Sequence, residues 1–389
     1  MGSSMGAAIN DPKLLPAAEP SSAAFASAAS PPRILNHDIM GCTAEGVVGN
    51  HLYSGRALGA TDPDDVIQIH PDLRPQWESI CGHYDRVGLS YSSNVIWDVG
   101  THHLCGYPEH EPSVFFFGDA EQGVRPDRAW HQAVDYINSK NRFMDLADHL
   151  GVPVPRTLRF DAISAIDDEA VATAPYPCYI KAAVSVSGVG IYRCEGPDAL
   201  RTAIASFDPH VPVQVQEEVQ TDCFLNLQYE VIDGHAARVA ATEQVLDGCV
   251  HQGNRHPVPA PPWEIVDPMA GWLVAQGMRG LFAFDVAVLA PGARTEHLAI
   301  ECNPRWNGAS YPTMVARKLG IEHWLARTFP TRHRKLADID LSGIEFDRDS
   351  GTGVILVNWG PVLVGKLLVL LAGDPDQQQA LAQALSQRL

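Results

Sequence analysis

The chain lacks the features that mark several large classes of protein. Its eight cysteines include no Cys-x-x-Cys pair, so a disulfide framework is disfavoured and reduced thiols in a cytosol fit better. No basic segment followed by an apolar stretch opens the sequence, which argues against a signal peptide. There is no run of lysine or arginine, and a formal net charge of −18 repels nucleic acid and anionic membranes. We therefore expect a cytoplasmic protein that binds neither.

No apolar run reaches membrane-spanning length without interruption. The most apolar region, residues 354–371, contains Asn358, Pro361, Gly365 and Lys366, which predicts two buried elements around a turn. Apolar residues make up 46% of the chain and charged residues 19%, a balance typical of globular proteins with a sizeable core. A length of 389 residues suggests two or three domains.

Changes in composition divide the chain into four parts. Residues 1–32 are rich in Ala, Ser and Pro without an apolar period, which predicts a disordered arm. Residues 33–126 mix short apolar runs, residues 86–89 among them, with helical stretches, as in an open α/β domain. Residues 127–330 open with helical patterns and continue in strand-like runs, and residues 331–389 form a C-terminal segment of strand, turn and helix. The predicted fold class therefore combines α/β and α+β.

Two helices are predicted where the third part begins. Residues 127–137 carry apolar side chains at helical spacing, and Ser139 can cap a second helix. Gly151 ends that second helix, because Pro153 and Pro155 cannot continue it.

One candidate phosphate site follows an apolar strand. Lys181 ends the strand, and the small residues 185–190 come next. Glycine and serine let the backbone approach a ligand and turn several N–H groups towards it, and an ammonium adds a charge for phosphate. An ordinary hairpin with a Gly-Ser turn would give the same pattern, and no Walker sequence is present. Both interpretations stay open on these residues alone.

A second candidate site lies on a predicted β-hairpin. Residues 281–288 and 297–303 each show the alternation of a strand, and residues 290–295 between them fit a hairpin loop. On the first strand Asp285 lies opposite to the large apolar side chains. On the second strand one face is expected to carry Leu298, Ile300 and Cys302, and the other Glu301 and Asn303.

This hairpin brings carboxylates together. If it is symmetric about Ala293, Asp285 lies directly across from Glu301, and Asn303 adds an amide oxygen on the same face. Like charges placed opposite each other destabilise a sheet, and burial increases the cost. A hard divalent cation removes the conflict, because Mg²⁺ prefers carboxylate and carbonyl oxygens together with substrate phosphates. The alternative is an acidic strand face in solvent, which small alanine neighbours and the following 304–308 loop disfavour.

Two further segments flank these sites. Arg305 directly follows the acidic cluster, where a guanidinium can clamp a phosphoryl group or a carboxylate, although a surface ion pair is the usual role of a lone arginine. Residues 213–219 form a strand that ends in polar side chains. Its edge could offer backbone groups and a carboxylate to a purine and its ribose, and a solvated edge strand is the alternative.

The order of these segments resembles that of the ATP-grasp superfamily, which includes biotin carboxylase and D-alanine–D-alanine ligase. No single motif decides the resemblance, but five segments at sensible distances are specific, and they extend over residues 140–319. In chain order they are Lys140 with the helix that ends at residues 151–155, Lys181 with its Gly-Ser loop, the Gln216–Val219 edge, Asp285, and the run from Glu301 to Arg305.

The resemblance implies an ATP-grasp fold, with a nucleotide between two α+β subdomains, an N-terminal open α/β (pre-ATP-grasp) domain and a short C-terminal strand–turn–helix segment. ATP is the implied cofactor, with Mg²⁺ or, as a substitute, Mn²⁺. Asp285, Glu301 and Asn303 would hold the metal. Arg305, which would steady an acyl phosphate, and Lys181 would act in catalysis. The nucleotide would be bound by two lysines, by a lid over the phosphates and by an adenine-reading edge: Lys140, Lys181, Ser187, Gly188, Gly190, Gln216, Glu217, Glu218 and Val219.

The chain departs from the family pattern in two places. Many members have a ribose-binding Glu after the adenine-reading edge, where this chain has Phe224, Leu225 and Asn226. Asp222 or Asn226 is the candidate substitute. The first metal ligand is Asp285 rather than a Glu, which has the same charge and a shorter reach.

The implied activity is that of an ATP-dependent, ADP-forming carboxylate–amine ligase. An acid would attack the γ-phosphate of ATP to give an acyl phosphate, and an amine would then displace phosphate to form an amide or peptide bond. The N-terminal segment and residues 353–358 also resemble peptide ligases of specialised metabolism, the pheganomycin-type group. The alternatives are another acceptor, such as a thiol or a nucleotide-pathway amine, and a non-catalytic nucleotide-binding module. The expected partners are small molecules, and a homodimer is compatible with the family.

A zinc enzyme is a further alternative. Its ligands would be His102, His103 and Cys105, or Cys249, His251 and His256, but neither group has a known zinc spacing, and structural or surface roles are favoured. Substrate identity is expected to lie in residues 241–262, in the loop after Asn303 and in the N-terminal domain. Candidate contacts, any of which could equally be solvated, are His251, Asn254, Arg255, His256, Trp306, Asn307 and Tyr311.

Overall fold

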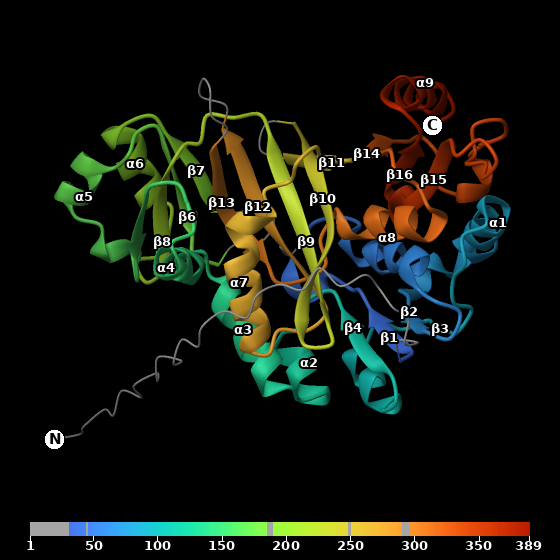
Figure 1. Ribbon diagram of the computed structural model, residues 1–389, viewed down its shortest axis with the longest axis horizontal. Helices are drawn as coiled ribbons and strands as arrows, with labels where there is room; N and C mark the ends of the chain where they lie inside the picture. Colours follow the sequence, from blue (N-terminus) through green and yellow to red (C-terminus); the bar gives the residue numbers. More distant parts are fainter. Residues whose placement is uncertain (1–30, 44–45, 185–189, 248–249, 290–295) are drawn as a thin grey trace.

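The computed structural model describes residues 31–43, 46–184, 190–247, 250–289 and 296–389, and Figure 1 shows its helices and strands. Within these residues three β-sheets form the frame: a parallel sheet of four strands, an antiparallel sheet of four strands, and an antiparallel sheet of eight strands. The four-stranded antiparallel sheet forms a separate lobe at the left of Figure 1. The fold therefore combines α/β and α+β parts, as predicted.

The parallel sheet lies in the N-terminal part of the chain and has the strand order β3-β2-β1-β4. Ile34, Leu35 and Ile67 in its central strands are fully buried, as expected where helices cover both faces of a parallel sheet. β2 pairs with one side of β1 and β4 with the other, so the strand order reverses between β1 and β4. The elements are β1 (Arg33–Asn36), η1 (Met40–Cys42), η2 (Asn50–Ala60), β2 (Val66–Gln68), η3 (Pro71–Gln76), α1 (Trp77–Val87), β3 (Val95–Ile96), η4 (Thr101–Gly106) and β4 (Glu111–Val114).

The apolar run 86–89, expected among the strands, ends helix α1 instead. Gly88 has a φ of 70°, and this left-handed conformation lets the N–H of Leu89 return to the carbonyl of Tyr84 at 2.9 Å. An apolar residue such as Val87 before a glycine fits a helix end as well as a strand end, and packing decides between them.

The four-stranded antiparallel sheet has the order β5-β8-β6-β7. Its small core joins Cys178, Ile180, Val213 and Val215 of the strands to Leu200 of a covering helix. Its elements are β5 (Thr157–Phe160), η5 (Ile163–Ala165), α5 (Asp168–Thr173), β6 (Cys178–Ala182), β7 (Ile191–Cys194), α6 (Pro197–Ile204) and β8 (Val213–Glu217).

The large antiparallel sheet has the order β13-β12-β9-β10-β11-β14-β16-β15, so the C-terminal strands extend it. One of its faces packs on α7, α3 and α4 around Tyr229, Phe282 and Phe284. Its far end shares a second core with the parallel sheet. The elements are α2 (Asp119–Val124), α3 (Arg128–Asn138), α4 (Lys140–Leu150), β9 (Phe224–Ile232), β10 (His235–Asp247), β11 (Val250–His256), α7 (Trp263–Ala275), β12 (Leu281–Leu289), β13 (Glu296–Asn303), α8 (Ser310–Leu319), β14 (Trp324–Pro330), η6 (Leu336–Asp338), β15 (Gly353–Asn358), η7 (Gly360–Val364), β16 (Lys366–Ala372) and α9 (Pro375–Ser386).

Helices α3 and α4 form where their sequences predict them. The buried residues of α3 are Trp130, Ala133, Val134 and Ile137, and Asp127 caps its start by accepting a hydrogen bond from the N–H of Trp130 at 3.0 Å. Ser139 caps α4, and Gly151 ends it with a φ of 69°. The segment that follows also protects the edge of the large sheet, because the carbonyl of Pro153 accepts a hydrogen bond from Ala299 at 2.8 Å.

The apolar stretch at residues 354–371 forms two strands around a turn, as predicted. β15 and β16 pair antiparallel, and the short helix η7 connects them. Across the described parts of the chain, no helix combines the length and the apolar character that crossing a membrane requires.

A buried hydrogen-bond relay fastens the C-terminal strands to helix α1. The N–H of Leu356 donates to Nε2 of His83 at 3.0 Å, so the proton of His83 lies on Nδ1, which donates to Glu345 at 2.6 Å. Arg86 also binds the carboxylate of Glu345 through two hydrogen bonds. Burial acts to raise the pKa of Glu345, but hydrogen bonds from His83 and Arg86 outweigh it and lower the pKa to about 2.

This relay predicts acid-sensitive stability. Because the folded-state pKa of Glu345 lies below its ordinary value of 4.5, its contribution to stability is complete above that value and is lost as the pH falls towards 2. We expect Glu345→Gln to lower the free energy of unfolding at pH 7 by about 1–3 kcal/mol. Urea unfolding should show this deficit shrinking between pH 5 and pH 2, whereas the exposed control Glu322→Gln should match the wild type throughout. A deficit that does not change with pH would contradict the assignment.

Candidate active site

The predicted acidic pair forms at one edge of the large sheet. β12 and β13 pair antiparallel, and Asp285 lies directly opposite Glu301, which confirms the pairing predicted from the sequence. The outer half of the hairpin has another register, in which Val286 pairs with Ala299 and Ile300 is an extra residue. This β-bulge is what brings Glu301, rather than Ile300, opposite Asp285.

The bulge also changes which side chains of β13 are buried. We expected Leu298, Ile300 and Cys302 to share one face. Instead Ala299 and Cys302 enter the core, whereas Leu298 and Ile300 stay partly exposed. The expectation was wrong because one extra residue shifts the alternation of a strand by one position.

Asp285 is held by two amide side chains. Asn226, which pairs with it from β9, donates to one carboxylate oxygen at 2.7 Å, and Asn303 donates to the other at 3.1 Å. Burial and the nearby charge of Glu301 raise the pKa of Asp285, and the two amides oppose that rise. Sequence reasoning considered Asn226 only as a ribose contact. The signal for its position is a polar face, Asn226 and Gln228, on an otherwise apolar strand.

Lys140 neutralises the second carboxylate. Its Nζ atom lies 2.8 Å from the carboxylate of Glu301, whose side chain keeps 33% of its surface exposed. The charge of Lys140 lowers the pKa of Glu301, and Lys181 and Arg305 add to this effect. Lys140 is the first residue of α4, and its own N–H donates to the carbonyl of Ala183 at 2.7 Å, which ties this helix to the end of β6. The structure therefore places Lys140, Lys181 and Arg305 around Glu301.

The second lysine lies on the four-stranded antiparallel sheet beside the predicted adenine-reading edge. Lys181 donates to Oε1 of Gln216 at 2.8 Å, and Gln216 in turn donates to Thr157 at 3.1 Å. The carboxylate of Glu217 accepts a hydrogen bond from the N–H of Arg156 at 2.8 Å, so it holds the chain that enters β5. Val219 follows on the segment that leads towards β9.

Glu218 is already paired within the protein. Arg193 donates to its carboxylate at 2.5 and 2.7 Å, Tyr179 at 3.1 Å and Gln220 at 2.9 Å. The hydrogen bond from Arg193 lowers the pKa of Glu218. The N–H of Glu218 donates to the carbonyl of Pro177 at 2.9 Å, so both the backbone and the side chain of Glu218 fix the predicted adenine-reading edge.

Of the three predicted lid residues, Ser187 and Gly188 lie outside the described residues. Gly190 lies just before β7, and its carbonyl accepts a hydrogen bond from Ala182 at 3.2 Å. Its φ of 76° is in the left-handed region, where a side chain would be strained.

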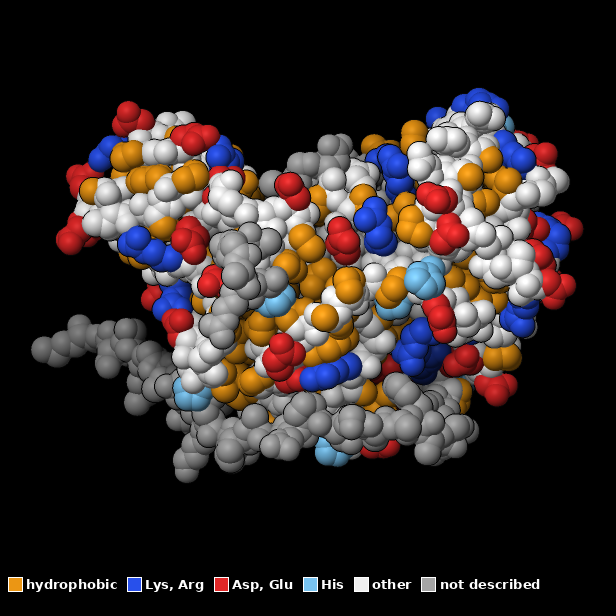
Figure 2. All heavy atoms as spheres, turned by 45° about the horizontal axis from the view of Figure 1, so that its top comes forward, with side chains coloured by type: hydrophobic (Ala, Val, Ile, Leu, Met, Phe, Trp, Pro, Cys, Tyr) orange, Lys and Arg blue, Asp and Glu red, His pale blue; other side chains and the backbone are white. Residues whose placement is uncertain are grey.

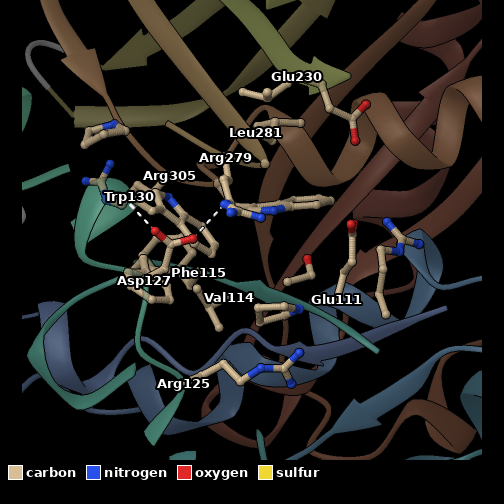
Figure 3. A pocket seen from close by; sticks show the side chains of 18 of the residues that line it. Glu111, Val114, Phe115, Arg125, Asp127, Trp130, Glu230, Arg279, Leu281 and Arg305 are labelled. Atoms are coloured by element: carbon tan, nitrogen blue, oxygen red, sulfur yellow. Dashed lines mark hydrogen bonds and ion pairs between the residues drawn. The ribbon is translucent and has the colours of Figure 1, made fainter. Parts of the chain in front are cut away.

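Arg305 connects the acidic pair to the N-terminal part of the molecule. It donates to the amide oxygen of Asn303 at 2.5 Å, and its guanidinium lies over the ring of Phe115, 5.5 Å from the centre. Arg305 and Phe115 also line a pocket of about 380 Å³ beside β4. Figure 3 shows an ion pair between Asp127 and Arg279 at 2.7 Å beside Arg305, with Glu111 and Glu230 on the other side of the view.

Several candidate substrate contacts converge on the loop that follows Asn303. His251 bonds to Asn254 at 2.7 Å and packs against Gly308, where an added Cβ would meet its ring at 2.8 Å. Burial lowers the pKa of His251. Asn254 donates to Thr242 at 3.0 Å, a buried partner that sequence reasoning missed. In the same loop Asn307 lies 3.5 Å from the amide oxygen of Asn226.

The other candidates divide into two groups. Trp306 and Tyr311 are buried against His37 of the N-terminal part, with ring centres 4.7 and 5.6 Å away. Arg255 pairs with Glu243 at 3.9 Å, and His256 stacks on Trp324 and bonds to the carbonyl of Ala241. Arg255 and His256 therefore have partners of their own away from the loop.

Of the zinc ligands considered, His102 and His103 group with Asp98 and not with Cys105 among the described residues. His102 and His103 lie near Asp98, at 4.0 and 3.0 Å, in a largely exposed group, whereas the thiol of Cys105 donates to the carbonyl of His102. Cys249 lies outside the described residues, and His251 and His256 have the separate partners given above. His51, His70 and Asp72 form another group of potential ligands.

Solved structures identify the fold. An N5-carboxyaminoimidazole ribonucleotide synthetase in its ADP complex matches with a TM-score of 0.57 at 12% sequence identity, over 90% of this chain and 94% of the other. The N5-carboxyaminoimidazole synthetase of Staphylococcus aureus complexed with ADP matches with a TM-score of 0.54 at 12% identity, over 91% and 96%. Both are ATP-grasp enzymes. This chain has the ATP-grasp fold. No protein-family model and no curated protein sequence matches it.

In this fold the site residues lie on two different sheets. Lys181 and Gln216 lie on the four-stranded antiparallel sheet, whereas Asp285, Glu301 and Arg305 lie on the large sheet or directly after it. Residues before β5 and after β8 connect the two sheets. Figure 2 shows the smaller lobe at the left, with a hollow between it and the rest of the molecule.

Proposed function

We propose that this chain is an ATP-dependent, ADP-forming carboxylate–amine ligase that makes an amide or peptide bond between small molecules. The observation that carries the proposal is the facing pair of Asp285 and Glu301, flanked by Lys140 and connected through Asn303 to Arg305. Two neighbours of the same fold are synthetases solved with ADP, and one of them makes an N5-carboxyaminoimidazole ribonucleotide. A role in specialised metabolism is part of the proposal.

The acidic pair fits Mg²⁺ or Mn²⁺. The two carboxylates offer hard oxygens, and Mg²⁺ is commonly bound by one or two carboxylates together with substrate phosphates. In the structure the NH2 group of Asn303 faces Asp285 and its amide oxygen accepts from Arg305, so this amide would have to turn to become the third ligand. Burial and the charge of Glu301 raise the pKa of Asp285, and the amides of Asn226 and Asn303 oppose that rise only in part. A divalent cation held there would neutralise charge on the phosphates of ATP.

The residues of this chain then have separate tasks. Lys140 and Lys181 would bind phosphate oxygens, Gln216 to Val219 would bind the adenine edge, and Ser187, Gly188 and Gly190 would cover the phosphates. The substrate carboxylate oxygen attacks the γ-phosphorus, the bond to the bridging oxygen breaks, and ADP leaves. Arg305 would hold the resulting acyl phosphate while an amine attacks the acyl carbon, loses a proton and expels phosphate. Rate enhancement by this arrangement comes from positioning and from fixed positive charge.

An ADP-release screen over pairs of amino acids and small carboxylates, with mass spectrometry of the products, tests the proposal. We expect ADP and an amide in equal amounts for at least one pair, and trapping by hydroxylamine when the amine is omitted. Hydroxamate without an amide for any amine would favour the acceptor alternative. Binding of ATP with Mg²⁺ but no ADP from any acid would favour the non-catalytic module and contradict the proposal.

A further inference from the structure

The parallel sheet has a topological switch point, and Phe115, which follows β4, contacts Arg305 beside the acidic pair. The chain proceeds from β1 to β2 and β3 on one side, while β4 joins on the other side of β1. In open α/β sheets, ligands bind in the crevice outside the carboxyl ends of the strands at such a reversal. Here His37 and Asp38 follow β1, and Phe115 follows β4. Tyr311 of α8 closes the crevice, and its hydroxyl lies 2.9 Å from Nδ1 of His37.

A buried arginine at this switch point has two donor groups without an acceptor in the described part of the chain, although its side chain also bonds to that of Tyr311. Arg56 of η2 is only 7% exposed, and its Nε and Nη2 groups find no hydrogen-bond acceptor among the described residues. Its guanidinium is surrounded by the rings of Tyr311, Phe115 and Tyr53, at 4.2, 4.7 and 5.1 Å from their centres. Cation–π contact stabilises the charge but leaves the donors on Nε and Nη2 unsatisfied. A buried guanidinium with unsatisfied donors is costly, and an anion is the partner that removes the cost.

Phe115 connects the switch point to the proposed catalytic centre. Arg305 and Arg56 both contact the ring of Phe115. Their guanidinium carbons lie 5.5 and 4.7 Å from its centre. The thiol of Cys42 lies close to both arginines: burial raises its pKa to about 11, and Arg305 and Arg56 each oppose that rise. An anion bound beside Arg56 is therefore next to the residue that reaches Asn303 and the acidic pair.

Buried acceptor oxygens lie in the same segment. Oδ1 of Asp38 and Oγ1 of Thr43 have no hydrogen-bond donor among the residues that the structure describes. Asp38 directly follows His37, whose ring bonds to the hydroxyl of Tyr311 beside Arg56, so these groups lie at the same end of the sheet. A ligand that satisfies the whole set carries an anion for Arg56 and a donor for Asp38 or Thr43, as an α-amino acid does.

We propose that this crevice binds the acid substrate as an α-amino acid, with its carboxylate on Arg56 within reach of Arg305 and its amino group on Asp38 and Thr43. The inference rests on the proposed ligase function and names the substrate class for that site. It assigns Arg56 as a substrate-binding residue, which the motifs of the sequence did not indicate. The reacting carboxylate would thereby be held beside the metal-binding pair before ATP is cleaved.

Binding without nucleotide tests the inference independently of turnover. The full-length chain would be titrated calorimetrically with each standard amino acid, with the matching carboxamide and desamino acid, and with inorganic phosphate. We expect at least one amino acid to bind about 30-fold more tightly than its carboxamide, since loss of a buried charge partner costs this much or more. Arg56→Gln should abolish that preference, and Asp38→Asn should reduce the preference for the amino acid over the desamino acid.

The controls separate binding from folding. Arg56→Lys keeps the charge and the ring contacts but loses the fork of donors, so it should melt near the wild-type temperature and still lose the preference for the carboxylate. Arg201→Gln changes a half-exposed arginine on α6 and should bind like the wild type. Equal binding of the amino acid to the wild type and both Arg56 variants, tighter binding of inorganic phosphate, or no amino acid bound would each overturn the inference. These titrations need no ATP, so the two proposals can fail separately. A chain that releases no ADP but still binds an amino acid through Arg56 would contradict the ligase proposal and leave the binding inference standing.

Discussion

Replacing Glu301 by Gln is expected to abolish most ADP release while leaving the fold intact. The change keeps the size of the side chain but removes the charge that faces Asp285 and that Lys140 neutralises at 2.8 Å. The pKa of Glu301 is lowered, so the wild-type group is ionised at neutral pH and the substitution removes a full charge. We expect kcat to fall by about 10²–10³-fold, the usual cost of losing one preorganised charged or polar group at a reacting phosphate.

A matched control lies on the same strand. Glu296 begins β13 and is exposed, so Glu296→Gln should retain wild-type ADP release. Both variants should have the circular dichroism spectrum and the melting temperature of the wild type. Calorimetric titration with ADP and Mg²⁺ should show weaker binding only for Glu301→Gln. If Glu301→Gln released ADP as fast as the wild type, the facing pair of Asp285 and Glu301 would have no role in catalysis, and the ligase proposal would be contradicted.

The parts of the site that follow local rules could be predicted from the sequence. A serine cap with a glycine end fixed helix α4 and hence Lys140 at its start. Alternation along two strands placed Asp285 and Glu301 on one face of a hairpin, although their direct pairing also requires the bulge at Ile300. These features depend on neighbours within a few residues, where dihedral preferences and side-chain periodicity act directly.

The features that the sequence did not predict depend on contacts between distant segments. Asn226 meets Asp285 only because β9 lies next to β12, a choice of strand partner that no local pattern encodes. The burial of Arg56 likewise requires rings from three segments, since Tyr53, Phe115 and Tyr311 are far apart in the chain. The bulge at Ile300 is a third case, because the hairpin loop alone would favour a regular register.

The largest expected effect on stability comes from a glycine in the middle of the large sheet. Gly253 lies on β11 opposite Arg327 of β14, and a Cβ added there would lie 1.9 Å from the carbonyl oxygen of Ala326. The obstacle is backbone in a paired strand and cannot rotate away, so the two strands would have to separate. In the strand order this contact joins β13-β12-β9-β10-β11 to β14-β16-β15, and it therefore connects the half of the sheet with the acidic pair to the half with the C-terminal strands.

We expect Gly253→Ala to lower the free energy of unfolding by about 3 kcal/mol or more, the upper range for inserting a methyl group where there is no room. Urea unfolding followed by tryptophan fluorescence measures the loss. Gly106→Ala is the matched control, because a Cβ at Gly106 meets nothing within 4 Å, and it should change stability by less than about 0.5 kcal/mol. Asn254 follows Gly253 and bonds to His251, which packs on Gly308 of the loop after Asn303, so ADP release should fall in the folded fraction of Gly253→Ala as well. Wild-type stability in Gly253→Ala would mean that β11 and β14 are not paired at this residue.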